Sequence, residues 1–307
     1  MWFTMVKGNR VHIVSGLILS AMILNILSFY ITFIEKAGAQ EEHKRTFLSA
    51  AVTTISSVTN NFINSTSTAK QTIQNETVAY YKNASGYLVY PVSNLPDNTT
   101  VATEKLPAVI MIHENRGLND NIKNTADILA KQGYVVLAVD LFQGQVTADP
   151  NRARELSSAV RNNPGIAIEN MKSAVDYLGS LQNVNASRIA SIGWCFGGGQ
   201  SLQLALNSED HPLAATVIYY GQVINDTKEL SKIKWPVLGI FGDQDQSISV
   251  DSVKAFERAL NETGVINEIY IYPGVGHAFA NPSNDNYAPQ ETADAWKKTL
   301  AFLDKYV

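Results

Sequence analysis

Short runs of apolar residues alternate with longer amphipathic stretches from residue 76 to the C-terminus. A continuous apolar run such as 107–112 is typical of a strand that is buried on both faces of a sheet. Between such runs apolar residues recur at helical spacing, and the stretch 122–132 ends at Gly133, a common helix-terminating residue. Strands that alternate with helices form mostly parallel sheets with helices on both faces. The pattern therefore predicts an α/β domain over residues 76–307.

The same pattern places the individual elements of this domain. A hairpin is expected to open it, with strands at 77–81 and 87–90 and a turn near 83–86. The remaining strands are expected at 107–112, 134–139, 188–192, 214–220, 237–241 and 268–272. Helices are expected at 122–132, 151–161, 166–181, 250–262, 289–306 and directly after residue 195. The carboxyl ends of the parallel strands then share one edge of the sheet, where α/β proteins bind their ligands.

The first 36 residues follow a different pattern, with apolar residues on all sides of the expected helix. Residues 11–34 contain no Asp, Glu, Lys or Arg, and this stretch is long enough to cross a membrane. Because Lys7 and Arg10 precede it, the positive-inside rule keeps the N-terminus in the cytoplasm and places the remainder outside. Cleavage after Ala39, in an A-x-A sequence typical of signal peptides, is the alternative. We expect an extracytoplasmic domain that is either anchored to the membrane by a transmembrane helix within residues 1–36 or secreted.

Composition distinguishes a linker from the domain and narrows the possible partners. Residues 37–75 are rich in Ser, Thr and Asn and poor in large apolar residues, which predicts a linker. The chain has 307 residues and a formal net charge of −4, without a basic run that would indicate a nucleic-acid partner. Its single cysteine excludes an internal disulfide, and its five histidines lack the spacing of metal ligands. We expect no metal or organic cofactor, and a monomer and a homodimer are equally compatible with the sequence.

The single cysteine lies in the segment Gly193-Trp194-Cys195-Phe196-Gly197, between an apolar strand and a helical pattern. This G-x-nucleophile-x-G order is that of the nucleophile elbow, a strained strand-to-helix turn that exposes its central side chain. Glycine is needed on both sides because a Cβ there would collide with neighbouring backbone. Taken alone, the motif is equally compatible with a buried structural cysteine on a glycine-rich turn.

Three more side chains come shortly after predicted strands, at the edge where Cys195 is expected. They are Glu114, Asp245 and His277, and the order nucleophile, acid, histidine is that of α/β-hydrolases. Asp243 competes with Asp245 for the role of the acid, but Asp243 is better placed to cap the turn. Because the candidate groups occur in the right order at the right strand ends, the sequence favours Cys195 as a nucleophile over a structural cysteine.

Together these residues resemble the dienelactone hydrolase family of α/β-hydrolases over about residues 76–307. The resemblance is carried by His113-Glu114-Asn115-Arg116-Gly117, Gly133-Tyr134, Asp140-Leu141, Gly193-Trp194-Cys195-Phe196-Gly197-Gly198, Gly242-Asp243-Gln244-Asp245 and Tyr272-Pro273-Gly274-Val275-Gly276-His277-Ala278-Phe279. It implies the α/β-hydrolase fold, a triad of Cys195, His277 and Asp245, and a position for Glu114 beside the nucleophile. In the family this carboxylate interacts with the resting thiol and helps to deliver a thiolate when substrate binds.

The activity implied is hydrolysis of a carboxylic ester or lactone. Cys195 is expected to attack the carbonyl and form a thioester, while His277 moves the proton and Asp245 orients His277. The backbone N–H groups of Phe196 and Asn115 are expected to form the oxyanion hole. Two alternatives stay open: a broad-specificity carboxylesterase or thioesterase of the same fold, and a non-catalytic, membrane-anchored binding domain.

The expected substrate-binding residues depart from the family pattern. Members that cleave dienelactone are expected to hold the carboxylate of the substrate with two arginines. One is expected at Arg152 or Arg154, but the other, a few residues after His277, is replaced by Asn281. Asparagine cannot supply the charge or the bidentate contact of arginine. We therefore expect a different ester or lactone as substrate. Arg116 either compensates for the missing arginine or is an ordinary surface arginine, and we favour the surface arginine.

Overall fold

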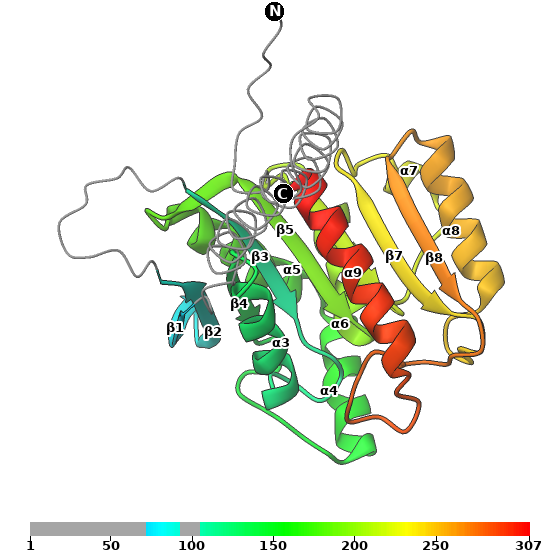
Figure 1. Cartoon of the computed structure of the whole chain (residues 1–307), viewed down its shortest axis with the longest axis horizontal. Helices are drawn as coiled ribbons and strands as arrows, with labels where there is room; N and C mark the ends of the chain where they lie inside the picture. Colours follow the sequence, from blue (N-terminus) through cyan, green and yellow to red (C-terminus); the bar gives the residue numbers. More distant parts are fainter. Residues whose placement is uncertain (1–71, 93–104) are drawn as a thin grey trace, which may run out of the picture. The chain divides into compact units, whose positions relative to one another are not determined.

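The computed structural model describes residues 72–92 and 105–307, and within them the strands form one sheet (Figure 1). Its strands are β1 (Ile73–Tyr81), β2 (Ala84–Pro91), β3 (Leu106–Ile112), β4 (Val135–Val139), β5 (Val184–Trp194), β6 (Ala215–Tyr219), β7 (Val237–Gly242) and β8 (Asn267–Tyr272). They lie in the order β1-β2-β4-β3-β5-β6-β7-β8, and the pairings from β4 to β8 are all parallel. The opening hairpin supplies the antiparallel pairings, between β1 and β2 and between β2 and β4. The predicted α/β fold with a mostly parallel sheet is confirmed.

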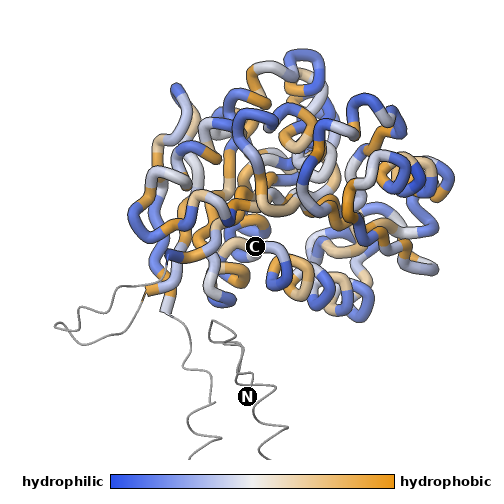
Figure 2. The backbone as a smooth tube through the Cα atoms, turned by 90° about the horizontal axis from the view of Figure 1, so that it is seen from above, coloured by the Kyte–Doolittle hydropathy of each residue, from blue (hydrophilic) through white to orange (hydrophobic). Residues whose placement is uncertain are grey.

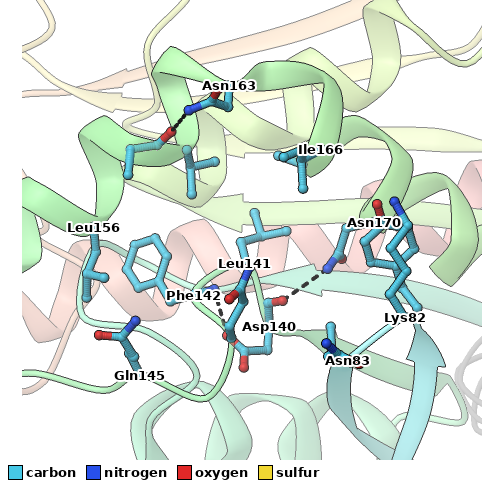
Figure 3. Close-up of a pocket in the computed structure, with 16 residues that line it drawn as sticks. Lys82, Asn83, Asp140, Leu141, Phe142, Gln145, Leu156, Asn163, Ile166 and Asn170 are labelled. Carbon is cyan, nitrogen blue, oxygen red and sulfur yellow. Dashed lines mark hydrogen bonds between the residues drawn. The ribbon is translucent and has the colours of Figure 1, made fainter.

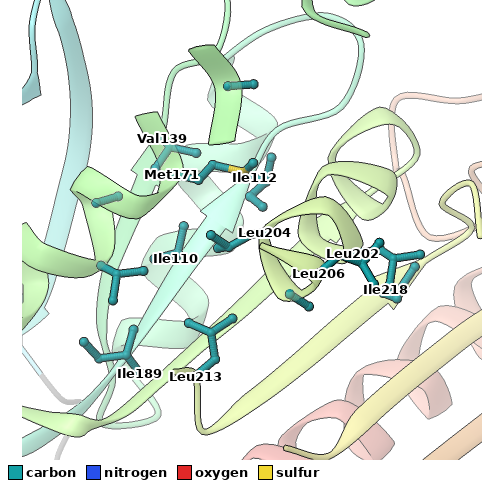
Figure 4. Close-up of a cluster of buried hydrophobic side chains, with 14 of the residues drawn as sticks. Ile110, Ile112, Val139, Met171, Ile189, Leu202, Leu204, Leu206, Leu213 and Ile218 are labelled. Carbon is teal, nitrogen blue, oxygen red and sulfur yellow. The ribbon is translucent and has the colours of Figure 1, made fainter. Parts of the chain in front are cut away.

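Helices cover both faces of this sheet. They are α3 (Asp120–Ala130), α4 (Pro150–Asn162), α5 (Pro164–Ser180), α6 (Phe196–Leu206), α7 (Thr227–Leu230), α8 (Val250–Glu262) and α9 (Pro289–Tyr306). Buried residues of α3 and α9 belong to one hydrophobic cluster, and those of α4, α5, α6 and α8 belong to the other. Figure 4 shows part of the second cluster, with side chains from the sheet, α5 and α6. Successive residues of β3 alternate between the two clusters, which explains its uninterrupted apolar sequence. Figure 2 shows hydrophobic residues concentrated inside the domain and hydrophilic residues along its outer loops.

Three local predictions need correction. The hairpin turn consists of Lys82 and Asn83, so Ala84 already begins β2; Lys82 takes up the positive φ of 41° that this short turn requires. Strand β1 begins at Ile73, ahead of residue 76, where the sequence placed the start of the domain, because its first residues pair with the end of β2. The short helix α7 was not predicted, since four residues carry too little periodicity to be recognised.

The predicted membrane anchor at 1–36 and most of the predicted linker at 37–75 lie outside the described residues. Within the part of the chain that is described, no helix combines the length and the apolar character that a membrane span requires. The anchor, its alternative cleavage after Ala39 and the extracytoplasmic location of the domain therefore stay predictions.

Candidate active site

Cys195 occupies a tight turn between the end of β5 and the beginning of α6. Its φ of 54° lies in the left-handed region, which non-glycine residues rarely adopt. A Cβ on Gly193 would lie 2.1 Å from the carbonyl oxygen of Gly197, and a Cβ on Gly197 would lie 2.3 Å from that of Ile112. Both glycines are therefore required by backbone contacts, as the elbow motif predicts. The turn holds the thiol at the carboxyl edge of the sheet.

This packing makes Gly197 far less tolerant of substitution than Gly199 in the same helix. We expect Gly197→Ala to lower the free energy of unfolding by about 3 kcal/mol, because the neighbouring backbone of β3 cannot move aside. Gly199→Ala is the matched control: a Cβ there meets nothing closer than 3.5 Å, and alanine favours the helix by up to about 1 kcal/mol. Urea denaturation of both variants measures the difference. Equal stability of the two variants would contradict this account of the elbow.

Cys195, His277 and Asp245 form a continuous chain of contacts. The Sγ atom of Cys195 lies 3.1 Å from Nε2 of His277, and Nδ1 of His277 lies 2.8 Å from Oδ2 of Asp245. The other carboxylate oxygen of Asp245 accepts hydrogen bonds from the backbone N–H groups of Ser247 and Ile248, at 2.7 and 3.0 Å. These two bonds fix the orientation of the carboxylate, and the carboxylate in turn fixes the imidazole ring.

The competing acid, Asp243, lies outside this chain of contacts. Its Oδ1 atom accepts a hydrogen bond of 2.7 Å from the backbone N–H of Gly274. This bond ties the loop after β7 to the loop after β8. The structure therefore brings Asp245, and not Asp243, to His277.

The surroundings of His277 favour its protonated form. Burial disfavours the charged imidazole, but the hydrogen bonds with Asp245 and Cys195 outweigh burial and raise the pKa of His277 to about 10. Burial acts in the opposite direction on Asp245 and by itself would raise the pKa of this carboxyl group. The contact with His277 and the two backbone donors outweigh burial and hold the pKa of Asp245 below its usual range. An imidazolium with an ionised carboxylate behind it is the arrangement that stabilises a negatively charged sulfur.

Glu114 lies in the same cleft, but its hydrogen bond goes to Asn281 and not to the thiol. The side-chain amide of Asn281 donates to Oε2 of Glu114. Glu114 is only 6% exposed, and burial raises its pKa to about 6, although the bond from Asn281 opposes this shift. The structure thus places Asn281 against the carboxylate of Glu114, in addition to lining the cleft.

His113, for which no role was predicted from the sequence, stabilises the loop that contains Glu114. Its Nδ1 donates to the carbonyl oxygen of Glu114 at 2.6 Å, and its Nε2 accepts from the backbone N–H of Leu141 at 3.1 Å. Complete burial lowers the pKa of His113, so the ring stays neutral in the tautomer that these two bonds need. The ring also packs against Phe142 and Phe196. His113 therefore links the loops after β3 and β4 to the beginning of α6.

The two residues predicted to supply the oxyanion hole, Phe196 and Asn115, both line the cleft with Cys195. Phe196 is the first residue of α6, and the first N–H groups of a helix have no partner within it. They also lie at the positive end of the helix dipole. The backbone N–H of Phe196 is thus suited to stabilise negative charge that develops next to Cys195.

The cleft has a volume of about 780 Å³, and helix α4 forms one of its walls. Arg154 and Arg161 of this helix line it, together with Arg116. Arg152 does not line it, because its guanidinium pairs with Glu155 at 2.6 Å and bonds Gln145. Of the two arginines predicted to bind the substrate, the cleft lining thus includes Arg154 but not Arg152. Arg116 is exposed, as interpreted from the sequence, and it also lines the cleft.

Arg161 was missed, although the sequence contained a signal for it. Arg154 and Arg161 are seven positions apart, which puts them on the same face of a helix two turns apart. The guanidinium of Arg161 lies 5.5 Å from the ring centre of Phe196, so it sits near the beginning of α6. Among the described residues, none of Arg116, Arg154 and Arg161 forms an ion pair, and Glu114 is the only carboxylate in the lining. The cleft is therefore positively charged.

A separate pocket of about 490 Å³ lies between the turn of the opening hairpin, the loop after β4 and helices α4 and α5 (Figure 3). Leu141, Phe142, Leu156 and Ile166 are among its lining residues, and the side chain of Asn163, between α4 and α5, bonds back to helix α4. None of the sequence-predicted site residues lines this pocket. The candidate chemistry is thus confined to the cleft at the carboxyl edge of the sheet.

The fold and the position of Cys195 define the class first: the protein is an α/β-hydrolase with a cysteine at the nucleophile elbow. A sequence profile described as the dienelactone hydrolase family matches residues 95–307. The chain belongs to this family, and its enzyme class is therefore that of hydrolases of carboxylic esters and lactones.

Individual relatives agree with this assignment. A homologue from Saccharolobus solfataricus that is named carboxymethylenebutenolidase is 30% identical over 242 residues, which cover 66% of this chain and 91% of the homologue. A Bradyrhizobium protein that carries the name of a 2-oxo-3-(5-oxofuran-2-ylidene)propanoate lactonase is 31% identical, over 66% of this chain and 85% of that protein. The solved structure named m3DLH shares the fold with a TM-score of 0.66 at 24% identity, over 78% of this chain and 99% of its own.

Proposed function

We propose that this enzyme cleaves a carboxylic ester or lactone through a covalent thioester on Cys195. The observation that supports this most directly is the continuous contact from Sγ through His277 to Asp245, at 3.1 and 2.8 Å. Sγ attacks the carbonyl carbon while the negative charge on the carbonyl oxygen is taken up by the backbone N–H groups of Phe196 and Asn115. His277 protonates the leaving alkoxide and then accepts a proton from the water that attacks the thioester. For a lactone, the leaving alkoxide stays attached to the acyl group.

Rapid quenching during hydrolysis of an activated aryl ester tests this mechanism. A good leaving group makes acylation fast, so the thioester accumulates and about one equivalent of phenol is released in a burst. We expect the acyl group on the peptide that contains Cys195, and neutral hydroxylamine should remove it, as it removes thioesters. Linear release of phenol from the first turnover, with no acyl group on this peptide, would contradict the proposal.

The charge of the cleft supports an anionic ester as substrate. Arg154 and Arg161 have no acidic partner among the described residues, and they extend from helix α4 toward the space beside Cys195. The Bradyrhizobium relative is named for a substrate that carries a carboxylate. Guanidinium groups bind carboxylates by charge-assisted, bidentate hydrogen bonds. Asn281 occupies the position of the second expected arginine, so we assign the contact with the carboxylate of the substrate to helix α4.

Hydrolysis of an anionic ester, p-nitrophenyl hydrogen succinate, and of a neutral ester of similar size, p-nitrophenyl butyrate, tests this assignment. The double variant Arg154→Gln with Arg161→Gln should raise KM for the succinate about tenfold, the loss expected for a charge-assisted hydrogen bond, and should leave the butyrate nearly unchanged. Arg152→Gln is the matched control, because this arginine belongs to the same helix but pairs with Glu155 away from the cleft. If Arg152→Gln affected the succinate as strongly as the double variant, recognition by α4 would be ruled out.

A further inference from the structure

Two buried polar atoms beside Cys195 form no hydrogen bond with any described residue. They are Oε1 of Glu114 and the hydroxyl oxygen of Tyr220. Glu114 is 6% exposed and Tyr220 is fully buried, and both residues line the cleft. A buried polar group without a partner costs about 1–3 kcal/mol of stability. An unpaired buried group in a folded protein therefore requires an explanation, such as a catalytic role or a bound water.

Tyr220 is held in this position by the backbone around it. Its φ of 34° is strained for a residue with a side chain, and it follows directly on β6. Its N–H donates to the carbonyl oxygen of Ile240 at 2.7 Å. The next residue, Gly221, packs so closely on α6 that a Cβ there would lie 2.4 Å from the carbonyl carbon of Gly198. These backbone contacts hold Tyr220 in its strained conformation and fix its ring at the base of the elbow.

The hydroxyl of Tyr220 faces the reacting groups. Its ring lies edge-on to the ring of His277, with 5.3 Å between the ring centres. Burial raises the pKa of Tyr220 well above its usual value, and the charges of Glu114 and Cys195 and a contact with the carboxylate of Glu114 raise it further. The hydroxyl and this carboxylate are therefore neighbours, although their contact does not have the geometry of a hydrogen bond. The phenol thus stays protonated and acts as a hydrogen-bond donor. Oε1 of Glu114 is an acceptor, because Asn281 already occupies Oε2.

We propose that Oε1 of Glu114 and the hydroxyl of Tyr220 hold the water molecule that hydrolyses the acyl-enzyme. This inference rests on the proposed thioester mechanism. A donor and an acceptor that are both buried, unpaired and adjacent to Cys195 form a polar site of the kind that binds a single water. Asn281 acts as a positioning residue, since its bond to Oε2 leaves Oε1 turned to the water.

The four tetrahedral positions of the water are then all used. One of its lone pairs accepts the hydrogen bond from Tyr220, and one of its hydrogens bonds Oε1 of Glu114. The other hydrogen is transferred to Nε2 of His277 as the second lone pair attacks the acyl carbon. The new C–O bond forms and the C–S bond breaks, so the sulfur leaves with the electron pair. The acid product departs, and the thiolate of Cys195 is left paired with the imidazolium of His277.

Presteady-state kinetics of Tyr220→Phe, with an activated aryl ester, tests the inference. We expect an unchanged burst, a steady-state kcat reduced about tenfold, and a thioester that accumulates in the intact-protein mass, as for the loss of one good hydrogen bond in the rate-limiting step. Tyr219→Phe is the matched control: its hydroxyl bonds Thr299 of α9 at 2.6 Å, and Tyr219 does not line the cleft. This control should leave both phases unchanged.

A second variant tests the same water site independently. In Glu114→Gln the side-chain oxygen stays with the amide donor of Asn281, so the new NH₂ group replaces the acceptor Oε1. Deacylation should slow as in Tyr220→Phe. Hydroxylamine, which attacks the thioester without needing this water site, should restore the turnover of both variants nearly to that of the wild type.

The outcomes separate this inference from the mechanism on which it rests. An unchanged kcat in Tyr220→Phe would overturn the water site while the thioester mechanism stands. A burst that slows in the same proportion as kcat would also overturn it, because the hydroxyl would then support attack by the sulfur. Absence of a burst and of an acyl adduct in the wild type would overturn both.

Discussion

Cys195→Ala should reduce kcat/KM for aryl esters by about 10⁴-fold or more, the usual scale for removal of a catalytic nucleophile. The variant removes one sulfur atom and keeps the Cβ, so it adds no steric conflict in the strained turn at φ 54°. Its free energy of unfolding should therefore stay close to that of the wild type. Progress curves over hours, with enzyme purified from a host that lacks background esterases, give the residual rate.

Two companion measurements make this result specific. Cys195→Ser keeps a nucleophile in the same position, 3.1 Å from Nε2 of His277 in the wild type, and should retain measurable hydrolysis well above that of Cys195→Ala. Iodoacetamide should inactivate the wild type by alkylating this single cysteine of the chain. A Cys195→Ala variant within tenfold of the wild type would remove the cysteine from the mechanism. The protein would then have to use another group, or act as a binding domain.

The elbow and the edge of the sheet could be predicted because they depend on local patterns. Continuous apolar runs require strands that are buried on both faces, and glycines on both sides of Cys195 are required by contacts of 2.1–2.3 Å with backbone carbonyl oxygens. In a parallel sheet, residues that follow strands meet at one edge. That rule alone brings Asp245 and His277 to Cys195 from distant parts of the sequence. Its success here depends on topology, which alternating elements largely determine.

The sequence was less informative about the walls of the cleft. Which arginines of helix α4 line the cleft depends on the rotation of the helix about its axis, which is set by the packing of residues such as Ala153 and Leu156. Arg152 instead pairs with Glu155 three residues later, an interaction that a helix allows at any surface position. Arg116 lines the cleft from a turn after β3, in which the N–H of Gly117 bonds the carbonyl oxygen of Glu114. A single sequence does not encode these rotations in any local motif.

The position of the Tyr220 side chain is a second feature of the site that could not be predicted from the sequence. Its neighbour Tyr219 is the same residue type and ends strand β6, yet Tyr219 bonds Thr299 on helix α9 while Tyr220 lines the cleft. Alternation along a strand would place the two side chains on opposite sides of the sheet, but both belong to the hydrophobic cluster of α3 and α9. It does not predict that the strained backbone of Tyr220 turns its hydroxyl toward Glu114 and Cys195. The unpaired hydroxyl becomes visible only in three dimensions.

Asp245→Asn should reduce kcat/KM by about 10³- to 10⁴-fold while the fold stays intact, as expected when a triad histidine is held in the wrong tautomer. Oδ1 of Asp245 accepts hydrogen bonds from the backbone N–H groups of Ser247 and Ile248, and these donors should keep the oxygen of the asparagine in place. The NH₂ group must then face Nδ1 of His277, where Oδ2 accepts in the wild type. Nδ1 becomes the acceptor, so Nε2 carries the proton and cannot take one from Cys195 or from water.

Asp243→Asn is the matched control for this substitution, with the same chemical change two residues earlier. Oδ1 of Asp243 accepts from the backbone N–H of Gly274, a bond that the amide oxygen of asparagine can keep. Its kcat/KM should stay within about threefold of the wild type, the range of an exposed hydrogen bond. Thermal unfolding of both variants checks that the loops after β7 and β8 remain folded. If Asp243→Asn lost as much activity as Asp245→Asn, the effect would reflect the shared loop, and Asp245 would no longer be assigned to orient His277.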